Sequence, residues 1–221
     1  MSPLDFDRPR LDRIGVVVGL TAEARIARRV FTHVEIGGGT AAGAELAARR
    51  LIGQGVEALI SFGLAGGLDP MLRPGTVVVP EAVVARGHCL ATDPGLNEQL
   101  GGGTHHTLLG AEEIAASADV KQHLFVVTGC AAVDLESGAV ALAAEEHRLP
   151  FAVLRAICDP AERDLPPAAL CALNETGAIG LLRVVASAIA GPRQIPALMA
   201  LGRDAAAARR ALVERADALR R

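Results

Sequence analysis

The sequence predicts an α/β protein built on one mixed central sheet flanked by helices. Short runs rich in Val, Ile and Leu alternate with Ala-rich segments along most of the chain. Strands that alternate with helices in this way favour a mostly parallel or mixed sheet that is covered on both faces. A length of 221 residues suits one domain with a sizeable core. We therefore expect a single domain over residues 1–221, ending in a helical C-terminal tail at 195–221.

Each predicted element rests on its local residue pattern. Short apolar runs bounded by breaker residues are typical of buried strands. Such runs occur at Ile14–Gly19, His33–Ile36, Glu57–Phe62, Thr76–Pro80, Ala82–Arg86, His123–Thr128 and Phe151–Ile157. Helices are predicted at Thr21–Val30 (with Thr21 as a candidate N-cap), Ala41–Ile52, Ser137–His147, Ile179–Ile189 and Ile195–Arg220. The stretch from Gly87 to Thr107 has the least pattern, and it is the best candidate for a mobile loop or lid.

Composition argues against several classes of protein. The formal net charge of -3 provides no field for nucleic acid, whose binding needs clustered cations. No apolar run approaches the roughly 20 residues that cross a bilayer, and the sequence MSPLDFDRPR has no hydrophobic signal core. We therefore expect a cytoplasmic protein whose four cysteines are free thiols. The histidines show no HxxxH or HExxH spacing and no GxSxG occurs, so we expect no metal, no other cofactor and no Ser-His-Asp triad.

Three acidic residues fall where we expect the chain to reach one rim of the predicted sheet. Glu136 and Asp159 stand at the ends of VDLESGAVALAAEEHRLPFAVLRAICD, and Glu23 follows the first strand. In α/β sheets ligands bind beyond the carboxyl ends of the strands, so this placement favours a site for proton transfer. Each residue also has a structural interpretation. Glu136 and Glu23 are first-turn acids that a helix dipole stabilises, and Asp159, which precedes a proline, is a turn or cap residue.

A glycine-rich connection follows the strand that ends at Phe62. Its sequence GLAGG allows backbone N–H groups to approach an anion or a polar ligand closely. It matches neither GxxxxGK[ST] nor GxGxxG, so the nucleotide-phosphate motifs are excluded. A tight turn without a ligand is the alternative interpretation.

Three segments together carry a family resemblance. They resemble the signature regions of the purine nucleoside phosphorylase and methylthioadenosine/S-adenosylhomocysteine nucleosidase superfamily. The segments are IGVVVGLTAEARI, LISFGLAGGLDPMLRPGTVVVPEAV and VDLESGAVALAAEEHRLPFAVLRAICDPAE. The resemblance runs from about Ile14 to Ala190. A closer resemblance is to the hopanoid-associated phosphorylases, and it is carried by SFGLAGGLDP, CDPAERDLPPAAL and the tail IPALMALGRDAAAARRAL. These enzymes act on adenosylhopane, release adenine and leave a ribosylated hopane.

The resemblance implies a role for each of the three acids. Asp159 matches the acid that protonates the purine near N7 as the glycosidic bond breaks, which requires a raised pKa. Glu136 matches the carboxylate that grips the ribose 2′ and 3′ hydroxyls. Glu23 matches the acid that positions and deprotonates the attacking water in the nucleosidases.

The same resemblance bears on the nucleophile. The phosphorylases of the superfamily hold phosphate with an arginine and a serine around the glycine loop. Here Ser61 stands at the arginine position and Leu64 at the serine position. Neither residue offers the bidentate guanidinium that phosphate favours, and the charge of Glu23 would repel phosphate. We therefore expect water to be favoured over phosphate.

Substrate contacts are less sharply implied. Gly66, Leu135 and Phe151 are candidates to line the site, although Phe151 is alternatively a core residue of its strand. A hopane is a large rigid apolar body, so its binding requires a wide apolar mouth. A nucleosidase for methylthioadenosine or S-adenosylhomocysteine needs a smaller pocket and is the alternative enzyme. A ligand-binding protein without catalysis is the alternative outside enzymes.

Two further expectations concern contact with a membrane and the oligomeric state. From Arg203 to the end, the chain has six arginines against three acids, with Leu and Ala between them. This pattern is typical of a basic helix at a membrane surface or of a solvated helix face. The resemblance also implies a homo-oligomer, because the family forms dimers or hexamers, and a dimer is favoured because the nucleosidases dimerise. The sequence shows no interface.

Overall fold

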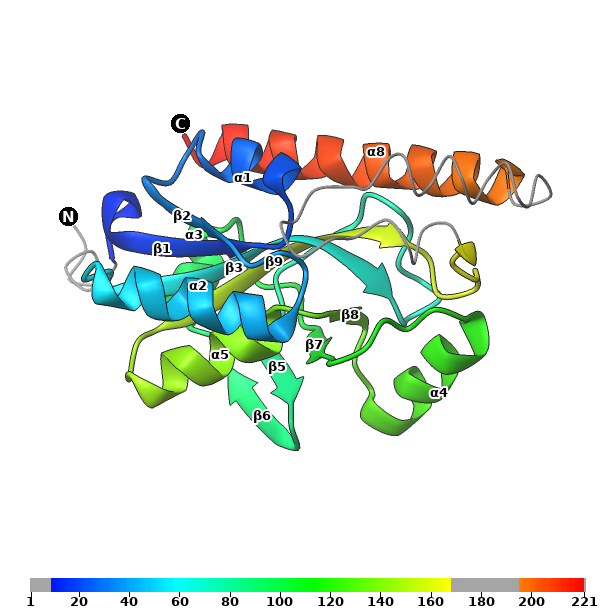
Figure 1. Cartoon of the computed structure of the whole chain (residues 1–221), viewed down its shortest axis with the longest axis horizontal. Helices are drawn as coiled ribbons and strands as arrows, with labels where there is room; N and C mark the ends of the chain where they lie inside the picture. Colours follow the sequence, from blue (N-terminus) through cyan, green and yellow to red (C-terminus); the bar gives the residue numbers. More distant parts are fainter. Residues whose placement is uncertain (1–8, 168–194, 221) are drawn as a thin grey trace.

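The computed structural model describes residues 9–167 and 195–220 of the chain (Figure 1). A single sheet of nine strands forms the centre of the described part. The strands are β1 (Ile14–Val18), β2 (His33–Ile36), β3 (Ala58–Gly67), β4 (Val77–Val78), β5 (Ala82–Ala85), β6 (His88–Ala91), β7 (Thr107–Gly110), β8 (Ala132–Asp134) and β9 (Phe151–Asp159). The helices are α1 (Thr21–Ala27), α2 (Ala41–Gly53), α3 (Pro94–Gln99), α4 (Ala118–Thr128), α5 (Ser137–Glu146) and α8 (Ile195–Ala218), and the short 3-10 turn Leu11–Arg13 precedes β1.

The sheet is mixed, as the sequence predicts. Its central strand β3 pairs in parallel with β1 on one side and with β9 on the other. At its far end β3 also pairs antiparallel with β8, through Gly66 and Gly67. β8, β7 and β5 then continue the sheet in parallel, and β6 closes that edge antiparallel to β5. The predicted fold class is confirmed.

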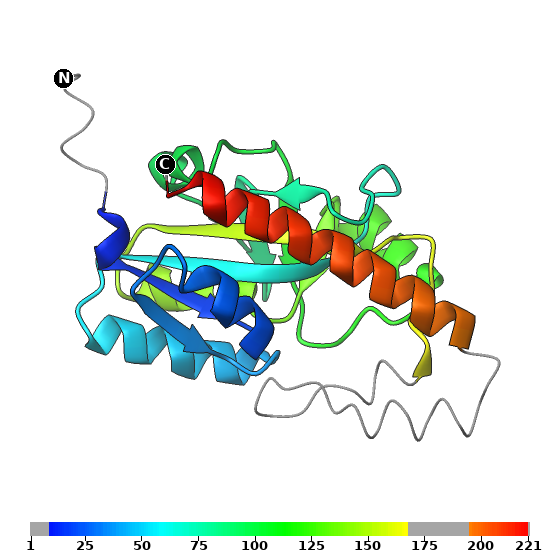
Figure 2. The same cartoon turned by 90° about the horizontal axis from the view of Figure 1, so that it is seen from above.

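Helices cover both faces of the sheet, and the strand residues alternate between them. Val17, Leu59 and Val153 belong to the apolar cluster that α2 and α5 complete. Ile60 and Leu154 belong to the opposite cluster, which α1, α3 and α8 complete. Successive strand side chains point to opposite faces, so neighbours such as Leu59 and Ile60 serve the two cores in turn. Figure 2 shows α8 crossing this second face above the sheet.

The parallel pairing fixes where a site can form. β1, β3 and β9 run in the same direction, so their carboxyl ends share one edge of the sheet. β9 carries one extra residue at this edge, because Ala65 pairs with Ile157 while Gly66 pairs with Asp159. Such a bulge re-aims the side chains around it. Asp159 is therefore placed beside the glycine loop by the strand pairing itself.

One predicted strand is wrong. His123–Thr128 lies in the second half of α4. Its β-branched and aromatic residues favour a strand, but the helix signals at the ends of the segment prevail. Ser117 accepts a hydrogen bond from the backbone N–H of Val120 at 3.2 Å, and Gly129 ends the helix with φ 68°.

The predicted loop at 87–107 is wrong as well. It contains β6 and α3, and the side chains of Leu96 and Leu100 are buried in the core. The backbone N–H of Asp93 donates to the carbonyl of Phe151 at 2.8 Å, which ties the segment to the start of β9. It therefore lies at the opposite end of β9 from Asp159 and is not a lid over that residue. The strand predicted at 76–80 shortens to β4, the short strands β7 and β8 were not predicted, and the helix predicted at 179–189 lies outside the described residues.

Candidate active site

The three predicted acids converge on one cavity. Glu23, Glu136 and Asp159 all line a cavity of about 430 Å³ at the carboxyl edge of β1, β3 and β9. Each of them is at most 7% exposed. The other lining residues are mostly apolar or small, and they are Leu20, Gly39, Leu64, Ala65, Gly66, Glu113, Ile114, Ala115, Val133, Asp134, Leu135, Cys158, Leu165, Leu198, Leu201, Gly202, Ala205 and Arg209.

Glu23 is held by the backbone on both sides of its carboxylate. It stands in the first turn of α1, and its Oε2 accepts from the N–H of Leu20 at 2.7 Å. Its Oε1 accepts from the N–H of Leu64 in the glycine loop at 2.8 Å. Gly63 makes this approach possible, because a Cβ there would lie 2.6 Å from Glu23 Oε1 and 2.6 Å from Arg155 Nη1. Burial raises the pKa of Glu23, and the nearby Arg155 opposes that rise.

Glu136 is held by a buried arginine that the sequence did not indicate as part of the site. Arg155 projects from β9, and its Nη2 donates to Glu136 Oε2 at 2.9 Å and to Ser61 Oγ at 2.7 Å. Burial raises the pKa of Glu136 to about 7, while the positive charge of Arg155 works against the rise. Glu136 therefore titrates near neutral pH at the wall of the cavity.

Asp134 and Ser137 anchor this arginine from the other side. Asp134 Oδ2 lies 2.5 Å from Arg155 Nε. Asp134 Oδ1 accepts from the backbone N–H groups of Glu136 at 3.2 Å and Ser137 at 2.9 Å. The turn between β8 and α5 is thereby locked to β9. This turn fixes the direction in which Glu136 enters the cavity.

Asp159 is paired with a lysine that comes from α4. Lys121 Nζ forms an ion pair with Asp159 Oδ2, and both side chains are buried. Asp159 Oδ1 is also buried, and it has no hydrogen-bond partner in the described part of the chain. Burial raises the pKa of Asp159, and the hydrogen bond and charge of Lys121 oppose the rise. Lys121 was missed because no element was predicted between the loop that ends at Thr107 and the strand that begins at His123, although its being the only lysine of the sequence was a signal.

Of the three other candidate substrate contacts, the structure brings two to the cavity. Gly66 and Leu135 both line it. Gly66 pairs with Asp159 on one side and with Val133 on the other. Phe151 does not line the cavity, because it begins β9 and pairs with Leu59, eight residues before Asp159. Its side chain packs in the core, so its interpretation as a core residue is the correct one.

The positions expected to hold phosphate are filled in another way. Ser61 is fully buried, and its hydroxyl accepts from Arg155 and lies 2.9 Å from that of Ser137. The side chain of Leu64 lines the cavity without a polar group. The guanidinium of Arg155 is 1% exposed and is shared among the carboxylates and hydroxyls described above. It is therefore already neutralised by protein groups.

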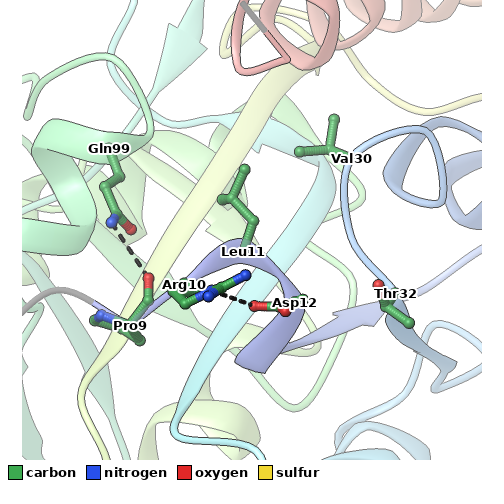
Figure 3. Close-up of a pocket in the computed structure, with 7 residues that line it drawn as sticks. All are labelled: Pro9, Arg10, Leu11, Asp12, Val30, Thr32 and Gln99. Atoms are coloured by element: carbon green, nitrogen blue, oxygen red, sulfur yellow. Dashed lines mark hydrogen bonds and ion pairs between the residues drawn. The ribbon is translucent and has the colours of Figure 1, made fainter.

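Other features of the described residues give no second site. Within residues 9–167 and 195–220, no group of three His, Cys, Asp or Glu is arranged to hold a metal ion. A search of the same residues for a helix long and apolar enough to cross a membrane finds none. A second hollow lies before β1 and β2, lined by Pro9, Arg10, Leu11, Asp12, Val30, Thr32 and Gln99 (Figure 3). It is at the amino ends of these strands and contains none of the three acids.

An α/β sheet that gathers three buried acids and a neutralised arginine around one cavity defines an enzyme of the acid–base type. Comparison with protein families identifies the class more closely. The family model of the phosphorylase superfamily matches residues 17–172. The chain therefore belongs to the phosphorylase superfamily, which confirms the resemblance at superfamily level. Comparison by sequence with curated proteins finds no significant match.

Solved structures share the fold over most of the chain. The 5′-methylthioadenosine/S-adenosylhomocysteine nucleosidase of Helicobacter pylori aligns with a TM-score of 0.65 and 16% identity, covering 94% of this chain and 99% of that one. The futalosine hydrolase of the same organism gives a TM-score of 0.65 and 16% identity, covering 94% and 98%. A nucleosidase of Colwellia psychrerythraea in complex with adenine gives 0.63 and 17%, covering 82% and 96%. At these identities the similarity establishes the fold.

Proposed function

We propose that this protein hydrolyses the N-glycosidic bond of a 5′-substituted adenosine and releases adenine. The observation that carries the proposal is the convergence of Glu23, Glu136 and Asp159 on one mostly apolar cavity. Breaking this bond builds positive charge on the ribose and negative charge on the purine. The three acids supply a group for each part of the reaction: the leaving base, the sugar and the nucleophile.

Asp159 is the proposed proton donor to the leaving base. A carboxyl group must be protonated to donate, and burial favours its protonated form. Its Oδ1 is buried and has no hydrogen-bond partner among the described residues, so it is available to a purine nitrogen. Protonation at N7 neutralises the purine as the electron pair of the C1′–N9 bond passes to the base.

Glu136 is the proposed ligand of the ribose hydroxyls. Its carboxylate accepts hydrogen bonds from the 2′ and 3′ hydroxyls, and its negative charge favours the cationic ribose of the transition state. Arg155 orients the carboxylate by donating to Oε2 at 2.9 Å. Since this arginine is buried and its charge is neutralised by protein groups, its proposed role is to hold Glu136 in position.

Water is the proposed nucleophile, with Glu23 as its base. The water proton passes to Glu23 as the oxygen bonds to C1′, which yields adenine and a free ribosyl product. A phosphate at the same place would meet four buried acids, Asp134 included, and no unpaired buried cation within the described residues. Arg209 is the one basic side chain among the lining residues, and it is exposed.

The apolar side chains that line the cavity favour a substrate with a large apolar 5′ substituent. Leu198 and Leu201 of α8 line it together with Ile114 and Leu165. We propose adenosylhopane as the substrate, because a hopane is a rigid hydrocarbon that such a wall accommodates. Methylthioadenosine and S-adenosylhomocysteine are the alternative substrates, with smaller or more polar 5′ groups.

One experiment separates these possibilities. The protein is incubated with adenosylhopane, methylthioadenosine and S-adenosylhomocysteine in turn, with and without inorganic phosphate, and both products are identified by mass spectrometry. We expect adenine and ribosylhopane from adenosylhopane at a rate that phosphate does not change. Strict dependence on phosphate, with a 1-phosphorylated sugar as product, would overturn the proposed hydrolysis. Turnover of the small thioethers without turnover of adenosylhopane would overturn the proposed substrate.

A peripheral membrane contact remains part of the proposal, but through a different part of the tail. The apolar face of α8 is occupied, because Ala208, Leu212 and Ala216 are buried against the core. Ile195 and Met199, which begin the same helix, are 44% and 64% exposed. We propose that these two residues contact the membrane from which a lipid substrate would enter. Liposome flotation of wild type against Ile195→Ser with Met199→Ser tests this, and equal flotation would exclude it.

We also propose a homodimer in the cytoplasm. Val126 and Val127 on α4 are 75% and 66% exposed, which leaves an apolar surface that a second copy would cover. Light scattering of the wild type and of Val126→Glu with Val127→Glu tests the interface. The wild type is expected as a dimer and the variant as a monomer. A monomeric wild type would exclude the proposal.

A further inference from the structure

The only lysine of the chain is buried, and its ammonium group bonds only to groups of the protein. Lys121 is fully buried, and its ammonium donates to Asp159 Oδ2, to the carbonyl of Pro160 at 3.0 Å and to the carbonyl of Arg163 at 2.8 Å. An ammonium group has three N–H donors, so all of them have partners. A buried charge is expensive unless it is paired in this way. The sequence therefore places a scarce residue type at a demanding position beside Asp159.

The surrounding segment holds the lysine in place. The backbone N–H of Ala118, at the start of α4, donates to Asp164 Oδ1 at 2.8 Å. The N–H of Leu165 donates to the carbonyl of Ala116 at 2.7 Å. The start of α4 is thereby joined to the loop that follows Asp159. Arg163 forms an ion pair with Asp204 of α8, so the other charges close to Asp159 compensate each other.

The lysine makes the two oxygens of Asp159 unequal. Oδ2 is bound by the ammonium, whereas Oδ1 is buried without a partner among the described residues. An unpartnered buried oxygen is unfavourable unless a ligand completes its hydrogen bonding. Because Asp159 lines the cavity, Oδ1 is the oxygen left for the substrate.

We propose that Lys121 is a positioning residue that directs Asp159 Oδ1 to the leaving base and stabilises the charge that proton donation leaves behind. This inference rests on the proposed function. In the reacting state the proton of Oδ1 bonds to N7 of the purine, and the C1′–N9 electron pair goes to the base. Asp159 becomes a carboxylate whose new negative charge is adjacent to the Lys121 ammonium. The ion pair therefore stabilises the product side of the proton transfer.

The test compares two leaving groups on one 5′-substituted ribose. Adenine needs a proton to leave, whereas 4-nitrophenolate is a good leaving group without one. For Lys121→Met, we expect adenine release to fall about 10²-fold while nitrophenolate release changes by less than about threefold. Both rates come from the same preparation, so their ratio does not depend on the fraction of folded protein. Asn97→Leu is the matched control, since Asn97 is buried but lies on α3 and bonds Thr92 away from the cavity.

The control is expected to leave the ratio of the two rates at its wild-type value. An equal fall of both rates in Lys121→Met would show a structural role and overturn the inference, as would an unchanged adenine rate. A wild type that releases adenine from no 5′-substituted adenosine would instead overturn the proposed function, whatever Lys121 does.

A double variant keeps the test decisive if Lys121→Met folds poorly. Lys121→Met with Asp159→Asn removes both charges of the buried pair, so no uncompensated charge remains. If Lys121 acts through Asp159, the double variant releases adenine within about threefold of Asp159→Asn alone. A further fall of about 10²-fold would show that the lysine acts independently of Asp159 and would contradict the proposal.

Discussion

The backbone N–H of Leu64 donates to the carboxylate of Glu23 at 2.8 Å. Leu64 stands where the phosphorylases of the superfamily are expected to bind phosphate with a serine. Here its side chain lines the cavity as an apolar group, while its backbone holds the acid that we assign to water activation. The residue at the expected serine position and the acid that we propose as the base for water are thus in direct contact.

Replacing the acid that holds this contact tests the nucleophile. We expect Glu23→Gln to lower adenine release about 10²- to 10⁴-fold, because an amide cannot take the proton of water. The amide must also turn its NH₂ toward one of two backbone donors, Leu20 N–H or Leu64 N–H, so some stability is lost. Initial rates are measured with and without phosphate, and a thermal melt confirms folding. Restoration of the rate by phosphate would contradict the assignment.

The pH dependence of stability tests Glu136. Its pKa is raised to about 7 in the folded protein, mainly by burial. An unfolded glutamate loses its proton near pH 4.3, so its contribution to stability is complete below that pH and is lost as the pH rises through about 7. Burial raises the pKa values of Glu23 and Asp159 too, which adds to the same trend.

We therefore expect Glu136→Gln to flatten part of this fall. Urea unfolding at pH 5 and at pH 8 measures the free energy of unfolding of both proteins. The difference between the two pH values is expected to be smaller in the variant than in the wild type. An equal difference in the two proteins would mean that Glu136 titrates at its ordinary pKa.

Buried and exposed arginines provide a matched comparison. Arg155→Met leaves Asp134 and Glu136 without their cation in a buried place, so we expect a loss of about 3–5 kcal/mol of folding free energy. Arg49 on α2 pairs with Glu45 and Glu146 at the surface, so Arg49→Met should leave the free energy of unfolding nearly unchanged. Chemical unfolding at neutral pH measures both. Equal losses would show that the Arg155 cluster is not the anchor that its burial indicates.

The three acids could be predicted from the sequence because they depend on local order. Glu23 follows β1 and Asp159 ends β9, and parallel strands bring such positions to one edge. Glu136 stands at the start of α5 after β8, which reaches the same edge by pairing antiparallel with the end of β3. Arg155 and Lys121 could not be assigned, because their roles arise from contacts between distant segments. Arg155 is a single charge inside the apolar run FAVLRAI, and its partners come from β3 and from the turn before α5. Lys121 lies in α4, whose HLFVVT sequence favours a strand until the ends of the helix are considered.

Phe151 shows the limit of a resemblance that is applied at a single position. It lies on β9, the strand that carries Asp159, but at the end that lies in the core rather than at the end that borders the cavity. Strand register separates Phe151 from Asp159 by almost the whole length of β9. A phenylalanine is a plausible neighbour for a purine, so residue type alone did not reveal the distance.

The cavity wall on α8 offers a test of the substrate. Leu201 lines the cavity and is partly buried, and position 202, a glycine, follows it on the same wall. Leu201→Asp places a charge where a hydrocarbon would pack, so we expect KM for adenosylhopane to rise by at least about tenfold, because burying an unpaired charge costs several kcal/mol. kcat is expected to change little, since none of the three acids is altered. Leu46→Asp is the control, because Leu46 is 58% exposed on α2 and is absent from the cavity wall. Steady-state kinetics in mixed detergent measures both variants. An unchanged KM in Leu201→Asp would show that the bound 5′ substituent does not pack against this wall.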